Sequence, residues 1–191
     1  MGIFLSLCFL MEIKPIEIIK KYYSEKSDLY RILLSHSTSV KEKALEIASI
    51  HPEMNLDKKF ISEAAMLHDI GICQTYALEI DCLGDFPYIC HGYLGADMLR
   101  KENLDKHALV SERHTGSGIT KKEIQERQLP IPCRDMLPIS NEEKIICLAD
   151  KFFSKTKLDK EKSIDEIRKG LAKYGKDSLA RFDELVTMFL S

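Results

Sequence analysis

The sequence lacks the cysteine patterns that mark proteins stabilised by disulfides or by structural zinc. It has six cysteines in 191 residues, but none forms a Cys-x-x-Cys pair. Their spacing matches neither a zinc knuckle nor a disulfide framework. No convincing export signal precedes them either, so we expect reduced thiols and a cytoplasmic protein.

Long apolar runs and blocks of like charge are also missing. The apolar stretch from Ile3 to Met11 is too short to cross a bilayer, and no run of five or six like charges occurs. The formal net charge is −2 and the pI is near 6.3. We therefore expect neither a membrane nor a nucleic acid polymer as a partner. Because Met11 reads like a natural start, residues 1–10 are either an upstream extension or an arm that packs on the core or forms a homodimer contact.

Strand-like alternation, internal repeats and low-complexity segments are absent, and helical periodicity runs almost throughout. We expect helices over about 15–26, 28–50, 57–70, 88–102 and 105–114. A short helix at 121–128 interrupts a loop-rich middle. Capping boxes at Ser140 and Ser163 then begin a helix that reaches about Thr156 and a charged amphipathic helix. A last helix carries Leu179 to Phe189.

These expectations predict an all-α, single-domain helical bundle, for which 191 residues suffice. We expect residues 1–27 to form an arm and a helix that pack on the core. Residues 28–158 would form the central helical domain, and residues 159–191 would add C-terminal helices to the same domain.

Polar side chains occupy positions that should face the apolar core. His36 shares a helix face with Leu33 and Val40, and His68 lies four residues after Ala64. Asp150 lies four residues after Ile146 in the helix that begins at Ser140. A single histidine in such a position is more often a hydrogen-bonded core residue than a ligand. Three helices that each turn such a group inward, with Asp69 beside His68, favour a buried cation as their partner.

The other four histidines divide into two pairs. His91, in "CHGYLGADML", and His114, in "ERHTGSGIT", fit the same pattern of ligands that face inward. We expect His51 and His107 to be solvated or to cap helices.

The order His36, His68-Asp69, Asp150 resembles that of the HD superfamily of metal-dependent phosphohydrolases, and "HDIG" at 68–71 matches the form that names one subfamily. The resemblance runs from about Leu33 to Lys155. It implies an HD domain with a metal site between the helices and His36, His68, Asp69 and Asp150 as primary ligands. Asp69 would bridge two ions, with His91 and His114 on the second. Ligands of this type suit Fe or Mn, with Mg, Ni or Zn as alternatives.

The resemblance implies hydrolysis of a nucleotide or another small phosphorylated metabolite through a metal-activated water. Many relatives have a lysine after HDIG that can hold phosphate, whereas this chain has Ile72. The catalytic set would then be Asp69 with Lys151 and Arg113 as replacement cations, and Arg134 as a weaker candidate. The alternatives are a binuclear-iron oxygenase of the same superfamily and, third, a ligand-binding helical domain that is not an enzyme.

Overall fold

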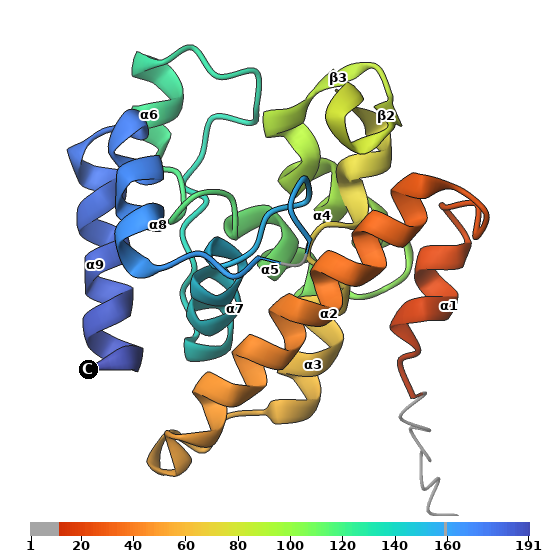
Figure 1. The fold of residues 1–191 in the computed structure, drawn as a ribbon. Helices are drawn as coiled ribbons and strands as arrows, with labels where there is room; N and C mark the ends of the chain where they lie inside the picture. Colours follow the sequence, from red (N-terminus) through yellow and green to blue (C-terminus); the bar gives the residue numbers. More distant parts are fainter. Residues whose placement is uncertain (1–11, 159) are drawn as a thin grey trace, which may run out of the picture.

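The chain folds into helices, as the periodicity predicts. The structure is a computed structural model that describes residues 12–158 and 160–191, so the N-terminal arm predicted at 1–10 lies outside the described residues. Within these residues we find nine α-helices and one very small sheet (Figure 1). The helices are α1 (Pro15–Lys20), α2 (Asp28–Ser49), α3 (Lys58–Leu67), α4 (His91–Lys101), α5 (Asp105–Arg113), α6 (Lys121–Glu126), α7 (Asn141–Lys151), α8 (Ile164–Leu171) and α9 (Lys176–Leu190). The prediction of an all-α, single-domain fold is confirmed.

Side-chain caps determine where several helices begin. The Ser27 hydroxyl accepts the N–H of Tyr30 and starts α2, and the Asp57 carboxylate accepts the N–H of Phe60 and starts α3. Ser163 forms a complete capping box with Glu166 at the start of α8.

At Ser140 the predicted capping box is only half formed. The Ser140 hydroxyl accepts the N–H of Glu143, as expected. The Glu143 carboxylate, however, binds the Arg113 guanidinium and the N–H of Ile139. It is therefore not available to the backbone of Ser140, because a charged partner competes for it.

Helix α7 ends at Lys151, about one turn before the Thr156 that periodicity predicts. Lys162 supplies the physical reason. Its backbone N–H donates to the carbonyl of Phe152, and its ammonium donates to the carbonyls of Lys151 and Phe153. These donors satisfy carbonyls that a longer helix would have used, so Lys162 lies against the end of α7.

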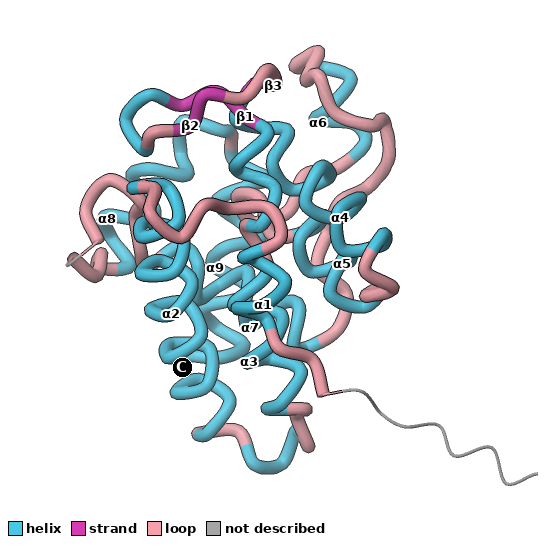
Figure 2. The backbone as a smooth tube through the Cα atoms, turned by 90° about the vertical axis from the view of Figure 1, so that its right-hand side faces the viewer, coloured by secondary structure: helices cyan, strands magenta, loops and turns pink. Residues whose placement is uncertain are grey.

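A small three-stranded sheet lies at one end of the helices, where the sequence analysis expected only a loop (Figure 2). It consists of β1 (Thr75–Ala77), β2 (Cys82–Leu83) and β3 (Phe86–Pro87), in the order β2-β1-β3. β1 is antiparallel to β2 and parallel to β3, with Tyr76 opposite both Leu83 and Pro87. Strands of two or three residues are too short to show an alternating pattern.

The apolar core consists of two clusters that adjoin along α2 and α3. The larger cluster joins the C-terminal half of α2 to α3, α7, α8 and α9, and includes Val40, Ala44, Ile61, Ile145, Ile146, Phe182 and Phe189. The smaller cluster joins α1 and the start of α2 to α4 and the turn after α3, and includes Ile19, Tyr23, Leu33, Ile70, Ile72 and Leu99. Among the described residues, no helix combines the length and the apolar character needed to cross a membrane.

Candidate metal centre

Six polar side chains meet at the boundary between the two apolar clusters. His36 lies in the middle of α2, His68 and Asp69 follow α3 directly, and Asp150 lies near the end of α7. His91 is the first residue of α4, and His114 follows α5 directly. Each of the six is at most 8% exposed. The structure thus brings together all the residues that the resemblance implies as metal ligands.

Two close backbone contacts position the turn that carries Asp69. The Tyr23 hydroxyl donates to the carbonyl of Ile70 and accepts the N–H of Cys73. Gly71 lies directly against α4, where a Cβ on it would be 2.2 Å from the carbonyl oxygen of His91 and 2.4 Å from the nitrogen of Gly95. The glycine of "HDIG" is therefore needed for the approach of the 70–74 turn to the helix that begins with His91.

The first group of ligands converges on one oxygen of Asp69 and one of Asp150. Asp69 Oδ2 lies 3.1 Å from His36 Nε2 and 2.9 Å from His68 Nε2. Asp150 Oδ1 lies 2.9 Å from His36 Nε2 and 3.5 Å from His68 Nε2. Two imidazoles and two carboxylates therefore face a common point.

The second group uses the other oxygen of Asp69. Asp69 Oδ1 lies 3.5 Å from His91 Nε2 and 3.4 Å from His114 Nε2, and the two Nε2 atoms are 3.1 Å apart. Asp69 thus presents one oxygen to each group, which is the geometry of a carboxylate that can bridge two cations.

The backbone determines which ring nitrogen of three histidines faces the centre. The Nδ1 atoms of His68, His91 and His114 each donate to a carbonyl three residues earlier, at 2.6 to 2.7 Å. The carbonyls of Ala65 and Ser111 belong to the last turns of α3 and α5, where helix carbonyls lack an intrahelical partner, and that of Tyr88 also accepts the backbone N–H of His91. Because Nδ1 donates to the backbone, Nε2 is the nitrogen that faces the centre and, in the neutral imidazole, the one that can bind a metal.

Burial and neighbouring charges shift the pKa values of the histidines in opposite directions. Burial would lower the pKa of His68, but the carboxylates of Asp69 and Asp150 outweigh it and raise that pKa to about 9. Burial lowers the pKa of His91 to about 3 and also lowers that of His114. Neutral His91 and His114 therefore direct lone pairs at each other, a repulsive arrangement that a cation between them would relieve.

The cluster passes two tests for metal binding. Ligand atoms about 2.1 Å from one ion in tetrahedral or octahedral geometry lie ~3.0–3.4 Å from one another, close to the separations of 2.9 to 3.5 Å given above. Within the described part of the chain, His36 Nδ1, His68 Nε2 and both carboxylate oxygens of Asp69 are buried without a hydrogen bond. Buried polar atoms that lack partners are costly, and a metal ion would satisfy the three that face inward. The buried cluster could therefore bind metal.

Two lysines contact the carboxylates of the cluster from the side of the 151–155 segment. Lys151 Nζ lies 2.7 Å from Asp150 Oδ2 and donates to the carbonyl of His114, and Lys155 Nζ lies 2.5 Å from Asp69 Oδ2. Burial opposes their charge, but the neighbouring carboxylates raise the pKa of both ammonium groups. Sequence reasoning missed Lys155. Its only signal in the sequence is the spacing of four residues from Lys151, which puts both lysines on one face of the helix predicted to reach about Thr156.

The two arginines named from the sequence lie elsewhere. Arg113 pairs with Glu143 at 3.0 Å, and Arg134 pairs with Glu112. Neither lines the cavity of about 940 Å³ that opens from the centre, whose walls include His91, His114, Asp150, Lys151 and Lys155. A catalytic role for Arg113 stays a prediction, while the two lysines are the cations beside the centre.

The remaining histidines differ from each other. His51 is half-buried and contacts Glu53 and the carbonyl of Phe189. The expectation of a solvated or capping His107 is wrong, since its ring is buried and packs against Phe60 with 5.0 Å between centroids. Burial lowers the pKa of His107 to about 4.

Comparison with known proteins identifies relatives in archaea. The chain is 36% identical to an uncharacterized protein of Methanocaldococcus jannaschii over 75% of this chain and 76% of that protein. It is 33% identical to a tRNA (cytidine(56)-2'-O)-methyltransferase of Picrophilus torridus over 69% of this chain, and 34% identical to the Thermoplasma volcanium enzyme of that name over 72%. The chain spans only 33% and 36% of these two methyltransferases. No solved structure gives a significant match.

These relatives correct the functional predictions. The predictions of a phosphohydrolase and of an oxygenase are wrong, because the relatives with a named activity are transferases. The expectation that no nucleic acid polymer is a partner is also wrong, because those relatives act on tRNA. It rested on net charge, which says nothing about how charges gather around one cavity. The HD domain model matches residues 33–154, and the chain belongs to the HD domain family.

Proposed function

We propose that this chain takes part in the 2'-O-methylation of tRNA, as the domain that holds a divalent metal and binds the RNA. The observation that carries this proposal is the similarity of more than two thirds of the chain to two tRNA methyltransferases. The chain matches only about a third of each methyltransferase. We therefore assign the binding of metal and tRNA to this chain, and methyl transfer to the two thirds of those enzymes that it does not match.

The charges at the centre support a role in binding an anion. Asp69 and Asp150 are already opposed by Lys151, by Lys155 and by His68, whose pKa is raised to about 9, so the cluster carries no net negative charge without an ion. Each divalent ion adds two positive charges in a buried place, and a phosphate group is a natural ligand to offset them. The "HDIG" sequence at 68–71 supports membership of the HDIG subfamily. The free thiols and a tRNA partner support a cytoplasmic location.

We propose that the centre binds two ions, Fe or Mn. His36, His68, Asp69 and Asp150 would hold the first, and Asp69, His91 and His114 the second. A bound ion would lower the pKa of a coordinated hydroxyl or water and offset phosphate charge. The chain's own residues orient the imidazoles through backbone carbonyls, and Lys151 and Lys155 supply fixed positive charge beside them.

Elemental analysis of protein purified without chelator tests the metal assignment. We expect about two ions per chain, falling to about one in the His91→Ala, His114→Ala double variant. One ion in both proteins would refute the second site, and none in either, even after reconstitution, would refute the centre as a whole.

Binding of an unmodified tRNA transcript tests the partner assignment. We expect the metal-loaded chain to bind tRNA at least tenfold more tightly than the chelated chain, as measured by fluorescence anisotropy at fixed salt. His68→Ala, which cannot complete the first group, should bind like the chelated protein whether or not metal is added. If the metal-loaded chain does not bind tRNA at moderate ionic strength, the proposed function is wrong.

A further inference from the structure

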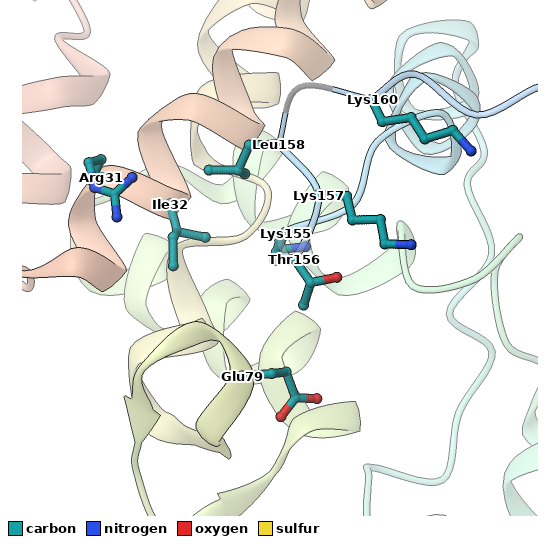
Figure 3. Close-up of a pocket in the computed structure, with 8 residues that line it drawn as sticks. All are labelled: Arg31, Ile32, Glu79, Lys155, Thr156, Lys157, Leu158 and Lys160. Atoms are coloured by element: carbon teal, nitrogen blue, oxygen red, sulfur yellow. The ribbon is translucent and has the colours of Figure 1, made fainter.

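A second cavity adjoins the one that opens from the metal centre. It has a volume of about 450 Å³ and is lined by two residues of α2, by Glu79, and by residues 155–158 and 160 (Figure 3). In Figure 3, Arg31 and Ile32 lie on α2, Thr156 and Lys157 lie across from them, and Glu79 lies below both. The two cavities share Glu79, Lys155 and Thr156 in their walls. They therefore join at Lys155, directly beside the metal centre, and we call them together the groove.

The groove is positively charged although the chain is not. Eight lysines and arginines line its two cavities against four aspartates and glutamates, whereas the whole chain has 28 basic and 30 acidic residues. Three of the four carboxylates already pair with cations, Glu123 with Arg181, Asp150 with Lys151 and Glu166 with Lys160. Basic side chains that gather along one concavity are typical of a site that binds a polyanion.

Two exposed aromatic side chains line the larger cavity of the groove. Tyr76 and Tyr174 line the larger cavity and are 56% and 55% exposed, so a ring face of each is open to a ligand. The guanidinium of Arg127 lies 5.5 Å from the centre of the Tyr174 ring. Exposed rings beside cations are the elements on which unpaired bases stack while the backbone follows the positive charges.

We infer that the groove binds a single-stranded segment of RNA that runs past the metal centre. Its phosphates lie along Arg31, Lys157 and Lys160 in the smaller cavity, and its bases stack on Tyr76 and Tyr174 in the larger one. A paired duplex turns its bases inward and cannot place them on these rings, so the groove selects unpaired nucleotides. The inference rests on the proposed function, because it names the form of tRNA that the same site binds.

A charge-removal variant tests the smaller cavity of the groove. Arg31→Gln, Lys157→Gln and Lys160→Gln remove three cations whose side chains are exposed and lie outside the ligand cluster. The matched control carries Lys58→Gln, Lys101→Gln and Lys106→Gln, which removes the same charge from exposed lysines that line neither cavity. Circular dichroism and metal content of both proteins verify that the fold and the centre are intact.

We expect the groove variant to bind tRNA at least tenfold more weakly than the control. The slope of log K against log salt should become shallower by about 2, since three phosphate contacts to a single strand contribute ~0.7 each. If both triple variants bind tRNA equally, the groove inference is wrong while the proposed function stands. If the wild-type chain does not bind tRNA at all, the proposed function itself fails.

A second variant tests the larger cavity of the groove without a change of charge. Tyr76→Leu with Tyr174→Leu keeps apolar bulk but removes both stacking faces. We expect an unstructured RNA oligonucleotide to bind this variant at least about fivefold more weakly, with an unchanged salt slope. An RNA duplex of the same length should compete poorly with the oligonucleotide for the wild-type protein. Unchanged affinity of the tyrosine variant, or better competition by the duplex, would overturn the single-strand assignment.

Discussion

From the contact between Gly71 and α4 we predict that Gly71→Ala loses both thermal stability and metal affinity. An alanine Cβ there would lie 2.2 Å from the carbonyl oxygen of His91 and 2.4 Å from the nitrogen of Gly95, where ordinary contacts begin at 3.4 Å. Both neighbours are backbone atoms and cannot rotate away as a side chain would. The start of α4 must therefore retreat by more than 1 Å, and His91 moves with it.

The magnitude follows from this displacement. Overpacking a well-packed interior costs typically ~1–3 kcal/mol and sometimes more, and contacts with backbone belong at the upper end. A loss of ~3 kcal/mol corresponds to a fall in melting temperature of ~6–12 °C for a chain of this size. His91 would also leave its position 3.5 Å from Asp69 Oδ1, so the second group of ligands should lose ~10–100-fold in metal affinity.

Thermal unfolding and metal titration of Gly71→Ala measure both effects. Gly170→Ala is the matched control, because a Cβ on Gly170 meets nothing within 4 Å in helix α8. Alanine is the better helix former there by ~0.5–1 kcal/mol, so the melting temperature of the control should rise by ~1–4 °C. A Gly71→Ala protein that melts within 2 °C of wild type and binds the same number of ions would refute the packing argument.

Three further predictions concern stability. Burial holds the pKa of His107 near 4, so its contribution is fully present above the unfolded-state pKa of about 6.5 and is lost as the pH falls toward 4. Between pH 7.5 and pH 5 the free energy of unfolding in urea should therefore fall by ~2 kcal/mol more in wild type than in His107→Leu, and equal losses would contradict this. Ser163→Ala breaks the complete capping box of α8 and should lower the free energy of unfolding by ~1 kcal/mol, as a urea titration at pH 7.5 would show. Chelation should lower the melting temperature of metal-loaded wild type but leave that of Asp69→Asn almost unchanged, because an ion stabilises only a fold that binds it.

The helices were predictable because their signals are local. The cap at Ser163 lies where the sequence analysis places it, the caps at Ser27 and Asp57 lie at the starts of two predicted helices, and the apolar faces follow the helical period. The end of α7 was not predictable, because it depends on Lys162, a residue that returns to the helix from a later segment. The strands at 75–87 are likewise held by pairings between segments and not by a pattern within one strand.

The candidate site was predictable to the extent that each ligand carries its own signal. His36 and Asp150 each occupy an apolar helix face in the sequence, and the structure places both inside. His107 misled the analysis because charged neighbours suggested solvent, whereas Phe60, 47 residues earlier in the sequence, covers its ring. The groove could not be predicted at all, since Arg31, Glu79 and Lys157 share no local pattern and meet only in the folded chain.

The place of the polar centre between the two apolar clusters bears on how the chain unfolds. Along α2, His36 separates Leu33 of the smaller cluster from Val40 of the larger one. A polar layer at that boundary contributes little to stability by itself, so each apolar cluster could unfold without the other. Two ions that share Asp69, one held by Asp150 and the other by His91, would join the clusters across the layer. Metal loading would then decide whether calorimetry records one cooperative transition or two overlapping ones.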